Sequence, residues 1–457
     1  MKTSDTSVPA FGSYAEAVDW ITRRAPVHGI KPGLKRMQRF MELLEHPERR
    51  LKFIHVAGTN GKGSTCAYLT SVLQKSGYDV GTFTSPYLEK FTNRLRFNGK
   101  DIEEEQLLEL ANRLKPLADE IEATELGAPT MFEICTALAI LYFAKMTYPD
   151  YVVWETGLGG EFDSTNIVSP VVTVITNVGH DHMDILGDSL VKVAKAKAGI
   201  IKAGVPVISA VDQPEVKEVI ERTAREKKAT LYLMNREYSY ETVSSELNKQ
   251  VFHFSGPFRQ IADLPISMNG HHQMENAAVA VMTLEVLRQY YALLLEDEAL
   301  TQGLYETHWP GRLEMISDQP RILLDGAHNP EGAATLAAAL KETYRYDRLR
   351  LMIGMLSTKD HSGFLTHILP LVNTLVITEP DFHKGLPAAK LAEQVEQLRS
   401  QLNDRVEIFV EPDWKKALKL LGGLTGPEDL AVVSGTLYLI SDVRSWILYQ
   451  SDSEKGW

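Results

Sequence analysis

The sequence has few cysteines, no long apolar run and no excess of basic residues, and each shortage excludes a class of protein. Its two cysteines, Cys66 and Cys135, stand far apart in apolar stretches, which indicates buried thiols in a reducing compartment rather than a disulfide framework. The longest apolar run, residues 134–144, is too short to cross a bilayer and predicts a buried helix. The first twenty residues contain no signal-peptide core. We therefore expect a soluble, cytoplasmic protein with no membrane partner.

The charge balance is acidic, because 48 lysines and arginines stand against 60 aspartates and glutamates and give a net charge of −12. A general nucleic-acid-binding surface needs basic residues in excess, so no nucleic-acid partner is expected. An anionic ligand must instead be attracted by local groups. The length of 457 residues and the apolar content of 44% are typical of a folded chain of two or three domains.

Short β-rich runs alternate with helical patterns along most of the chain, which predicts an α/β fold with parallel sheets covered by helices. In the first part, strands are predicted at residues 51–58, 80–84, 151–155, 171–177, 205–209 and 230–233, with short strands again between 251 and 266. A second series starts after residue 311, with strands predicted at 321–324, 349–354, 374–378, 406–410 and 430–433. We predict a large parallel-sheet domain over residues 1–300 and a smaller Rossmann-like domain over 301–457.

One glycine-rich segment has the composition of a phosphate-binding loop. Residues 58–64 read GTNGKGS and lie between a predicted strand and a predicted helix. Glycines there let backbone N–H groups approach an anion at the positive end of a helix. Lys62 would neutralise phosphate charge, and Ser64 or Thr65 would reach a metal-bound oxygen. The spacing differs from the common P-loop, since a further glycine follows the lysine. A glycine-rich turn without a ligand is the alternative.

This loop resembles that of the Mur-ligase superfamily, and six further segments are similar, in the same order, to signatures of its folylpolyglutamate synthase/dihydrofolate synthase branch. They are TSPYL at 84–88, ETGLGG at 155–160, TNVGHDH at 176–182, KAGIIK at 197–202, WPGRLE at 309–314 and DGAHNP at 325–330. The likeness extends from GIKPGL at 29–34 to SGTLY at 434–438. It implies a Mur-ligase fold, in which a P-loop domain binds ATP and folate and the C-terminal domain binds nucleotide and glutamate.

Within this resemblance the loop residues imply a nucleotide site, formed by Thr59, Asn60, Gly61, Lys62, Gly63 and Ser64. Asn276, Arg312 and Asp325 match family positions that hold the nucleotide. The fork of donors on Arg312 suits phosphate oxygens, and Asp325 can accept hydrogen bonds from ribose hydroxyls. His328 would lie near the transferred phosphate. An interdomain salt bridge between Arg312 and Asp325 is the alternative.

Three polar residues, Ser85, Glu155 and His182, follow three different predicted strands. The carboxyl ends of parallel strands meet in one crevice, so these residues can share a metal ion. The resemblance implies Mg²⁺. Histidine is an unusual ligand for that ion, which leaves Mn²⁺ or an intervening water open. A strand-end ion pair for Glu155 and an ordinary loop position for His182 are the alternatives.

Lys197 is a candidate for covalent modification. Burial lowers the pKa of a lysine, which can then take up CO₂ as a carbamate and become an anionic metal ligand. The family carries a carbamylated lysine at the matching position, so the resemblance implies this role, close to a second metal ion, for Lys197. The alternative is a surface lysine on one helix with Lys192 and Lys195.

The resemblance also places the pterin portion of a folate against two segments. An aromatic ring stacks on a flat heterocycle, and a carboxylate accepts hydrogen bonds from its N–H groups. The implied contacts are Thr130, Phe132, Glu133, Phe162, Asp163 and Ser164. Core packing is an equal alternative for Phe132.

Two positions depart from the family pattern. Glu161 stands where the family usually has arginine, and Ala196 stands where it usually has glutamate. An anion in place of a cation repels an acidic substrate, strongly if desolvated and weakly if exposed. These departures favour, as an alternative, a relative that binds ATP or folate with impaired ligase activity or with a different acid substrate.

The activity implied by the resemblance is ATP-dependent addition of L-glutamate to a folate, to dihydropteroate or to both. ATP would convert the substrate carboxylate into an acyl phosphate, which the amino group of glutamate attacks. Lys62, the metal ions and Arg312 would stabilise the developing charge. A P-loop phosphotransferase with no amide product is a third hypothesis. We expect a monomer whose two domains close over ATP and stay apart without it.

Overall fold

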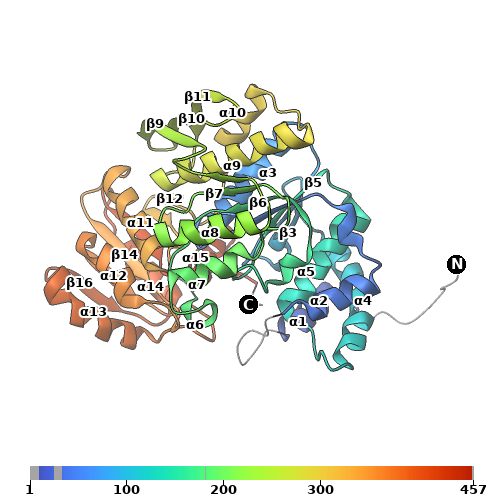
Figure 1. Ribbon diagram of the computed structural model, residues 1–457. Coiled ribbons are helices and arrows are strands. Elements are labelled where there is room, and N and C mark those ends of the chain that lie inside the picture. The colour runs from blue at the N-terminus through green and yellow to red at the C-terminus, as the bar shows by residue number, and fades with distance from the viewer. Residues whose placement is uncertain (1–9, 25–32, 181, 455–457) are drawn as a thin grey trace.

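The computed structural model describes residues 10–24, 33–180 and 182–454. Most of segment 29–34 and Asp181 of segment 176–182 lie outside the described residues. Figure 1 shows two lobes, the first in blue to yellow and the second in orange and red. The first lobe surrounds an eight-stranded sheet and carries a small three-stranded sheet, and the second lobe surrounds a six-stranded sheet. The predicted α/β architecture is confirmed.

The eight-stranded sheet has the order β4-β3-β2-β5-β1-β6-β7-β8. Its strands are β1 (Phe53–Ala57), β2 (Val80–Phe83), β3 (Leu95–Phe97), β4 (Lys100–Asp101), β5 (Tyr151–Glu155), β6 (Pro170–Ile175), β7 (Val207–Ser209) and β8 (Leu231–Leu233). The strands from β2 to β8 in this order are parallel, as predicted, while β3 and β4 form an antiparallel edge that the sequence pattern did not predict. Strand β1 is buried throughout and lies in the centre.

Helices cover both faces of this sheet, because each strand presents apolar residues to either side. One face packs against α3 (Lys62–Lys75), α9 (His271–Tyr291) and α10 (Asp297–Glu306). The other packs against α1 (Tyr14–Thr22), α2 (Lys35–Leu43), α4 (Glu104–Glu122), α5 (Met131–Tyr142), α7 (Leu190–Ala198) and α8 (Pro214–Glu226), with the short α6 (Met183–Leu186) beside α7. Cys66 and Cys135 are buried and free in α3 and α5, which confirms their packing role.

The small sheet is antiparallel and consists of β9 (Ser239–Glu246), β10 (Lys249–Ser255) and β11 (Gln260–Ile266). Its apolar side packs on α9 through Phe252, Phe254 and Leu264. Strand β9 was not predicted, because its polar sequence is mostly exposed and lacks an apolar alternation.

The six-stranded sheet of the second lobe has the order β12-β13-β17-β14-β15-β16. Its strands are β12 (Glu314–Asp318), β13 (Arg321–Leu324), β14 (Leu349–Ile353), β15 (Thr374–Ile377), β16 (Glu407–Val410) and β17 (Leu430–Ser434). Helices α11 (Pro330–Glu342), α12 (His361–Ile368) and α13 (Ala388–Leu402) cover one face, and α14 (Trp414–Leu424) and α15 (Leu437–Tyr449) cover the other. Only β12, an antiparallel edge strand, is absent from the prediction.

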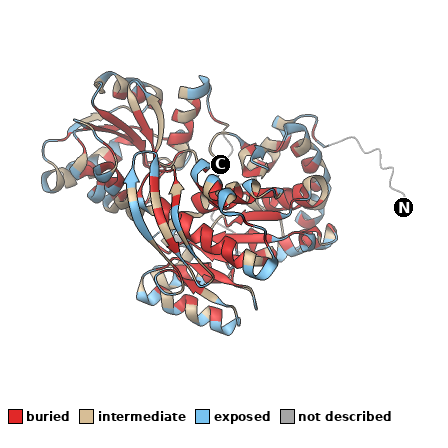
Figure 2. Ribbon diagram, turned by 90° about the horizontal axis from the view of Figure 1, so that it is seen from above, coloured by how far each residue is buried: buried red, intermediate tan, exposed pale blue. Residues whose placement is uncertain are grey.

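Figure 2 shows buried residues concentrated along the sheets and on the helix faces turned towards them. Within the described residues, no helix combines the length and apolar character needed to cross a membrane. The division at residue 300 stays a prediction. Helix α10 crosses that residue and packs against α3, with Leu300 and Leu304 in the core of the first lobe.

Candidate active site between the two sheets

The segment 58–64 joins the end of the central strand β1 to the start of α3, as predicted. Two of its glycines are required by close approaches. A Cβ at Gly58 would lie 1.8 Å from Thr176 Oγ1, and a Cβ at Gly61 would lie 2.3 Å from Asn276 Oδ1. Gly61 also has a φ of +79°, which a larger residue adopts only with strain. The sequence therefore brings Asn276 against the loop.

Polar side chains hold the loop and the first turn of α3. Lys62 Nζ donates to the carbonyl oxygens of Gly58 at 3.1 Å and Thr59 at 3.3 Å, so its ammonium lies over the loop. Ser64 is buried and accepts a hydrogen bond from Gln273 at 3.3 Å. Gln273 in turn accepts from the Asn276 amide at 3.2 Å. The start of α9 therefore packs directly on the predicted phosphate-binding loop.

The opposite side of the loop meets the segment after β6. The backbone N–H of Thr59 donates to the Asn177 carbonyl at 3.0 Å, and that of Asn60 donates to the Asn177 side chain at 2.8 Å. The Thr59 hydroxyl accepts from the Gly179 N–H at 2.9 Å. The ends of β1 and β6 are thereby joined into one polar edge.

The two lobes touch beside this edge. Asn60 and Asn329, from the start of α11, exchange amide hydrogen bonds of 3.1 and 3.4 Å. Glu331 accepts from both the backbone N–H and the Nδ1 atom of His180, at 2.9 and 2.8 Å. The two lobes are therefore in contact beside the loop, where complementary polar groups of both face each other, and the separation of the domains without ATP stays a prediction.

Ser85 and Glu155 come together where β2 and β5 end. Glu155 is 4% exposed, and its Oε2 accepts the backbone N–H of Ser85 at 2.9 Å. Burial raises the pKa of the Glu155 carboxyl, against the opposing effects of Lys62, the Ser85 N–H and Arg312. The Ser85 hydroxyl is buried and has no hydrogen-bond partner among the described residues. A carboxylate and an unused hydroxyl therefore lie side by side.

A cleft between the lobes contains both residues. Its lining from the first lobe includes Gly63, Thr84, Ser85, Pro86, Tyr87, Leu88, Asn93, Arg96 and Glu155, and its other wall is Trp309, Pro310, Arg312 and Leu437. The Trp309 indole packs so closely that a Cβ at Gly63 would lie 2.7 Å from its Nε1. The Arg96 guanidinium lies over the same ring, 5.8 Å from its centre. The start of α3 is thus shielded from water on this side.

Arg312 lines this cleft with a partly buried side chain. One of its amino groups donates to the Gly311 carbonyl at 3.1 Å. Burial lowers the pKa of Arg312, and the negative charges of Asp325 and Glu155 act in the opposite sense. Asp325 instead accepts the backbone N–H groups of Leu313 at 3.1 Å and Ala327 at 2.9 Å. The described contacts of Arg312 and Asp325 thus include no direct salt bridge between them.

His328 lies one turn further along the same loop. Its Nδ1 is 2.8 Å from the carbonyl oxygen of Gly326. A Cβ at Gly326 would collide with the Arg312 guanidinium, at 2.2 Å from Nη1. The DGAHNP segment therefore packs directly against Arg312, and it brings His328 and Asp325 to the same side of the second sheet.

The residues at the cleft suit a hard divalent cation bound in part by other oxygens. In the parts of the chain described here, no group of three or more His, Cys, Asp and Glu side chains has the arrangement of a metal site. Glu155 and the unpartnered Ser85 hydroxyl supply two oxygen donors. Mg²⁺ is typically held by one or two protein oxygens together with phosphates and water. His182 directly precedes α6, and it has an exposed side chain and a φ of 52°.

Lys197 is buried in α7, so the surface alternative for it is wrong. The last turn of α7 packs under segment 155–160, where a Cβ at Gly160 would lie 2.9 Å from the Lys197 carbonyl oxygen. Glu161 and Ala196, the two residues that depart from the expected family pattern, also lie here. The backbone N–H of Glu161 donates to the Ala196 carbonyl at 2.7 Å. The Glu161 side chain is exposed.

The predicted pterin contacts fall into two groups. Phe132 and Asp163 flank Gly157, where a Cβ would lie 2.5 Å from the Phe132 ring and 3.2 Å from Asp163 Oδ2. Phe162 is 57% exposed beside them, and Ser164 begins a short 3₁₀ turn for which Asp163 is the cap. Asp163 also accepts the Leu158 N–H at 2.7 Å. The first group thus surrounds the end of segment 155–160.

Thr130 and Glu133 have structural partners of their own. They form a reciprocal cap at the start of α5, with distances of 2.8 and 3.3 Å. Glu133 is buried and pairs with Arg36 at 2.8 Å. These contacts explain both residues without a ligand, and their contact with a substrate stays a prediction.

Several residues at the site were not predicted individually. Gln273 and Trp309 contact the phosphate-binding loop, and Asn177 and Asn329 bond to it from two sides. Trp309, Asn177 and Asn329 lie inside segments that carry the resemblance, and Gln273 lies one turn before Asn276. Their position inside or next to these segments was the signal by which the sequence could have identified them.

Comparisons with known proteins agree with this geometry. Residues 56–284 match the Mur ligase middle domain, and residues 311–437 match the Mur ligase, glutamate ligase domain. A dihydrofolate synthase/folylpolyglutamate synthase of Bacillus subtilis is 39% identical over 95% of this chain and 99% of its own. A folylpolyglutamate synthase of Lacticaseibacillus casei is 32% identical over 91% and 94%.

A solved structure has the same overall arrangement. The folylpolyglutamate synthase of Mycobacterium tuberculosis in complex with ADP superposes with a TM-score of 0.88 at 26% identity, covering 96% of this chain and all of that one. The fold, the order of the site segments and these relatives agree, and the chain belongs to the folylpolyglutamate synthase/dihydrofolate synthase family of Mur ligases.

Proposed function

We propose that this protein is an ATP-dependent ligase that joins L-glutamate to the carboxylate of a folate and, as a second acceptor, of dihydropteroate. The proposal depends on one observation: the start of α3, the Ser85–Glu155 pair and Arg312 line the same cleft between the two lobes. A carboxylate reacts with an amine only after activation, and a triphosphate bound across such a cleft supplies that activation.

The roles of the charged groups follow from their positions. Lys62 lies over the loop, where it meets phosphate oxygens, and Arg312 offers its remaining donors from the opposite wall. Both cations stabilise negative charge on the phosphoryl group during transfer. Asn276 and Asp325 bind the nucleoside portion in this proposal, and His328 lies near the transferred phosphate. The ADP complex of the mycobacterial relative supports ATP as the nucleotide.

Ser85 and Glu155 would hold Mg²⁺, with His182 as a third contact directly or through water. The ion would neutralise phosphate charge and orient the triphosphate. Mn²⁺ satisfies the same donors and, with its greater affinity for nitrogen, suits a direct bond from His182 better. The buried Lys197 is the proposed carbamylation site beside a second ion.

The pterin end of the substrate would lie against Phe132, Phe162, Asp163 and Ser164, near Gly157. The exposed Phe162 ring is available for stacking, whereas Asp163 also holds the turn at Leu158. In this proposal Thr130 and Glu133 contact the substrate from the start of α5, where they also form the helix cap. The exposed position of Glu161 gives no support to the alternative of an impaired relative, because an exposed charge repels a substrate weakly.

The decisive experiment is a product assay by mass spectrometry. Purified protein receives ATP, Mg²⁺ and L-glutamate with either tetrahydrofolate or dihydropteroate, and ADP release is followed in parallel. We expect a product heavier by one glutamyl residue with at least one acceptor, and no ADP release when glutamate is omitted. ADP release without an amide product would support a phosphotransferase instead.

We also propose a monomer in the cytoplasm, divided into domains at residues 1–300 and 301–457. The two buried, free thiols support a reducing compartment. Sedimentation of the purified protein tests the oligomeric state.

A further inference from the structure

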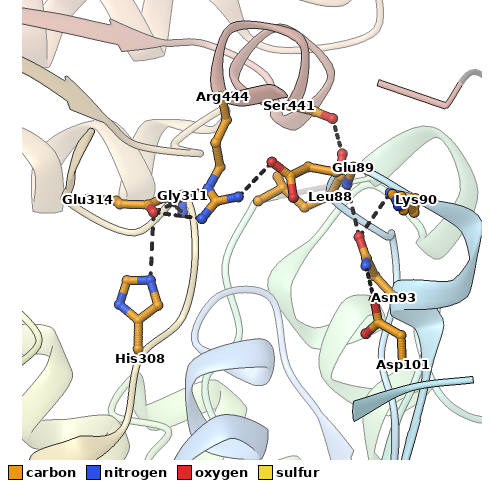
Figure 3. A network of polar contacts seen from close by, with 10 residues as sticks. All are labelled: Leu88, Glu89, Lys90, Asn93, Asp101, His308, Gly311, Glu314, Ser441 and Arg444. Carbon is orange, nitrogen blue, oxygen red and sulfur yellow. Dashed lines mark hydrogen bonds and ion pairs between the residues drawn. The ribbon is translucent and has the colours of Figure 1, made fainter. Parts of the chain in front are cut away.

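Arg444 lies at the centre of a polar network that joins the two lobes, and it belongs to none of the segments that carry the family resemblance. The residue is on α15 of the second lobe, and its side chain is only 11% exposed. Figure 3 shows its guanidinium between two carboxylates, Glu89 of the first lobe on one side and Glu314 on the other.

Both carboxylates bind the arginine closely. Arg444 Nη1 is 2.6 Å from Glu89 Oε1, and its Nε and Nη2 atoms each lie 3.0 Å from an oxygen of Glu314. Burial acts to lower the pKa of Arg444, but the hydrogen bonds and charges of Glu314 and Glu89 outweigh it and raise that pKa. A bidentate contact on one side and a charged contact on the other fix the plane of the guanidinium.

On the first-lobe side, the network holds the loop that carries Ser85. Residues 84–88 line the cleft, and Glu89 follows them directly. Ser441, one turn before Arg444 on α15, donates its hydroxyl to the Leu88 carbonyl. Asn93 accepts the backbone N–H groups of Glu89 and Lys90 at 3.1 and 2.9 Å. The loop therefore has little freedom while Arg444 is bound to Glu89.

On the other side, the network holds the turn that carries Arg312. Glu314 Oε2 accepts the backbone N–H of Gly311 at 2.8 Å, and His308 lies 3.6 Å from the same carboxylate. The carbonyl of Gly311 in turn accepts a hydrogen bond from the Arg312 guanidinium at 3.1 Å. One carboxylate thus connects Arg444 to the backbone that orients Arg312.

We propose that Arg444 is a positioning residue for the ligation reaction: its guanidinium holds the Ser85 loop and the Arg312 turn at a fixed separation across the cleft. The inference rests on the proposed function, in which that cleft binds ATP. Among the described residues, Arg444 contacts none of those assigned to substrate or nucleotide. Its effect follows from its bridging position, because Arg444 is the charged link between Glu89 on one wall and Glu314 on the other, and losing either partner of the Arg444–Glu89 pair releases the two walls.

The competing explanation is that Arg444 only stabilises the second lobe. Glu89 distinguishes the two explanations, because it belongs to the first lobe and its largely buried carboxylate contacts Arg444 of the second. If Arg444 acts within its own lobe, Glu89 is dispensable for ATP use. If it bridges the cleft, loss of Glu89 reproduces the effect of losing Arg444.

The test compares Arg444→Met, Arg444→Lys, Glu89→Gln and the double variant Glu89→Gln/Arg444→Met with the unchanged protein. Arg399→Met is the control, because Arg399 forms a pair with Glu396 inside α13 and lies away from the cleft network. KM for ATP and kcat are measured by glutamate-dependent ADP release, and thermal unfolding reports stability.

We expect Arg444→Met and Glu89→Gln each to raise KM for ATP about tenfold, a size typical of coupling between sites. The double variant should be no worse than Arg444→Met alone, since Arg444→Met already removes the contact with Glu89. Arg444→Lys should be intermediate, because a single ammonium cannot bind both carboxylates with the same geometry. One result would overturn the proposal. Arg444→Met would lower the unfolding temperature but leave KM for ATP within about twofold of the unchanged protein, and Glu89→Gln would change neither quantity.

A distance measurement keeps this inference separate from the proposed function. Spin labels at Glu218→Cys on α8 and Gln397→Cys on α13 report the separation of the lobes, and both native thiols are buried. With ATP present, we expect a longer or broader distance distribution in Glu89→Gln and Arg444→Met than in the labelled parent. Identical distributions would refute the positioning role. If the parent forms no glutamyl product, the proposed ligation fails while this comparison still decides the role of Arg444.

Discussion

Removing the charge of Glu314 should destabilise the protein in a manner that depends on pH. Burial by itself raises the pKa of this carboxyl, but hydrogen bonds from His308, Arg444 and the Gly311 N–H outweigh it and lower the pKa from 4.5 to about 2. At about 1.4 kcal/mol per pKa unit the shift corresponds to roughly 3 kcal/mol, and allowance for solvent screening reduces this to about 2–3 kcal/mol.

The sign of the effect follows from the direction of the shift. Because the folded pKa lies below the unfolded one, the carboxylate contributes its full stability above the ordinary pKa of 4.5. That contribution is lost as the pH falls from 4.5 towards about 2. The Glu314→Gln variant lacks it at every pH, and it also leaves the Arg444 guanidinium with a weaker partner.

Thermal unfolding of Glu314→Gln and of the unchanged protein between pH 3 and pH 8 measures the difference. Near neutral pH we expect the variant to melt about 5–10 °C lower, since 1 kcal/mol corresponds to about 2–4 °C for a domain of this size. The two curves should converge as the pH falls. Glu396→Gln is the matched control, because that exposed carboxylate pairs with Arg399 within α13. Equal melting temperatures at pH 7 would refute the role assigned to Glu314.

Three further outcomes follow from the site. Gly61→Ala should raise KM for ATP at least about tenfold, because a φ of +79° costs alanine roughly 1–2 kcal/mol and its Cβ displaces Asn276; an unchanged KM would contradict this. Glu155→Gln should lower kcat by about a hundredfold or more without lowering the melting temperature, since burial disfavours the charged carboxylate. Glu161→Arg should change the ligation rate less than about twofold, because the side chain is exposed.

Much of the fold could be predicted because the parallel strands are short, apolar and bounded by polar loops. Strands β5 and β13 begin and end at the predicted residues. The missed strands are the edge pair β3 and β4, the mostly exposed β9 and the edge strand β12. Such strands lack the continuous apolar run of a strand buried on both faces, so their pairing depends on neighbours that the local sequence does not reveal.

The predicted site is close to the observed one for a topological reason. The ends of β2, β5, β1 and β6 are neighbours in the sheet, so the segments that follow them meet at one edge. The order of the motifs and strands along the chain was therefore enough to predict that Ser85, Glu155 and the phosphate-binding loop lie close together. Arg444 and Glu89 carry no such signal, because their contact joins residues 355 positions apart and depends on how the lobes are placed.

Neither Glu161 nor Ala196 argues against a working ligase. The backbone N–H of Glu161 donates to the Ala196 carbonyl at 2.7 Å, so the two residues lie close together at the end of α7. The Glu161 side chain is exposed, where water and salt screen its charge, and alanine at 196 adds no second carboxylate there. A screened charge at this place repels an acidic substrate weakly, so the ligation reaction is expected to tolerate it.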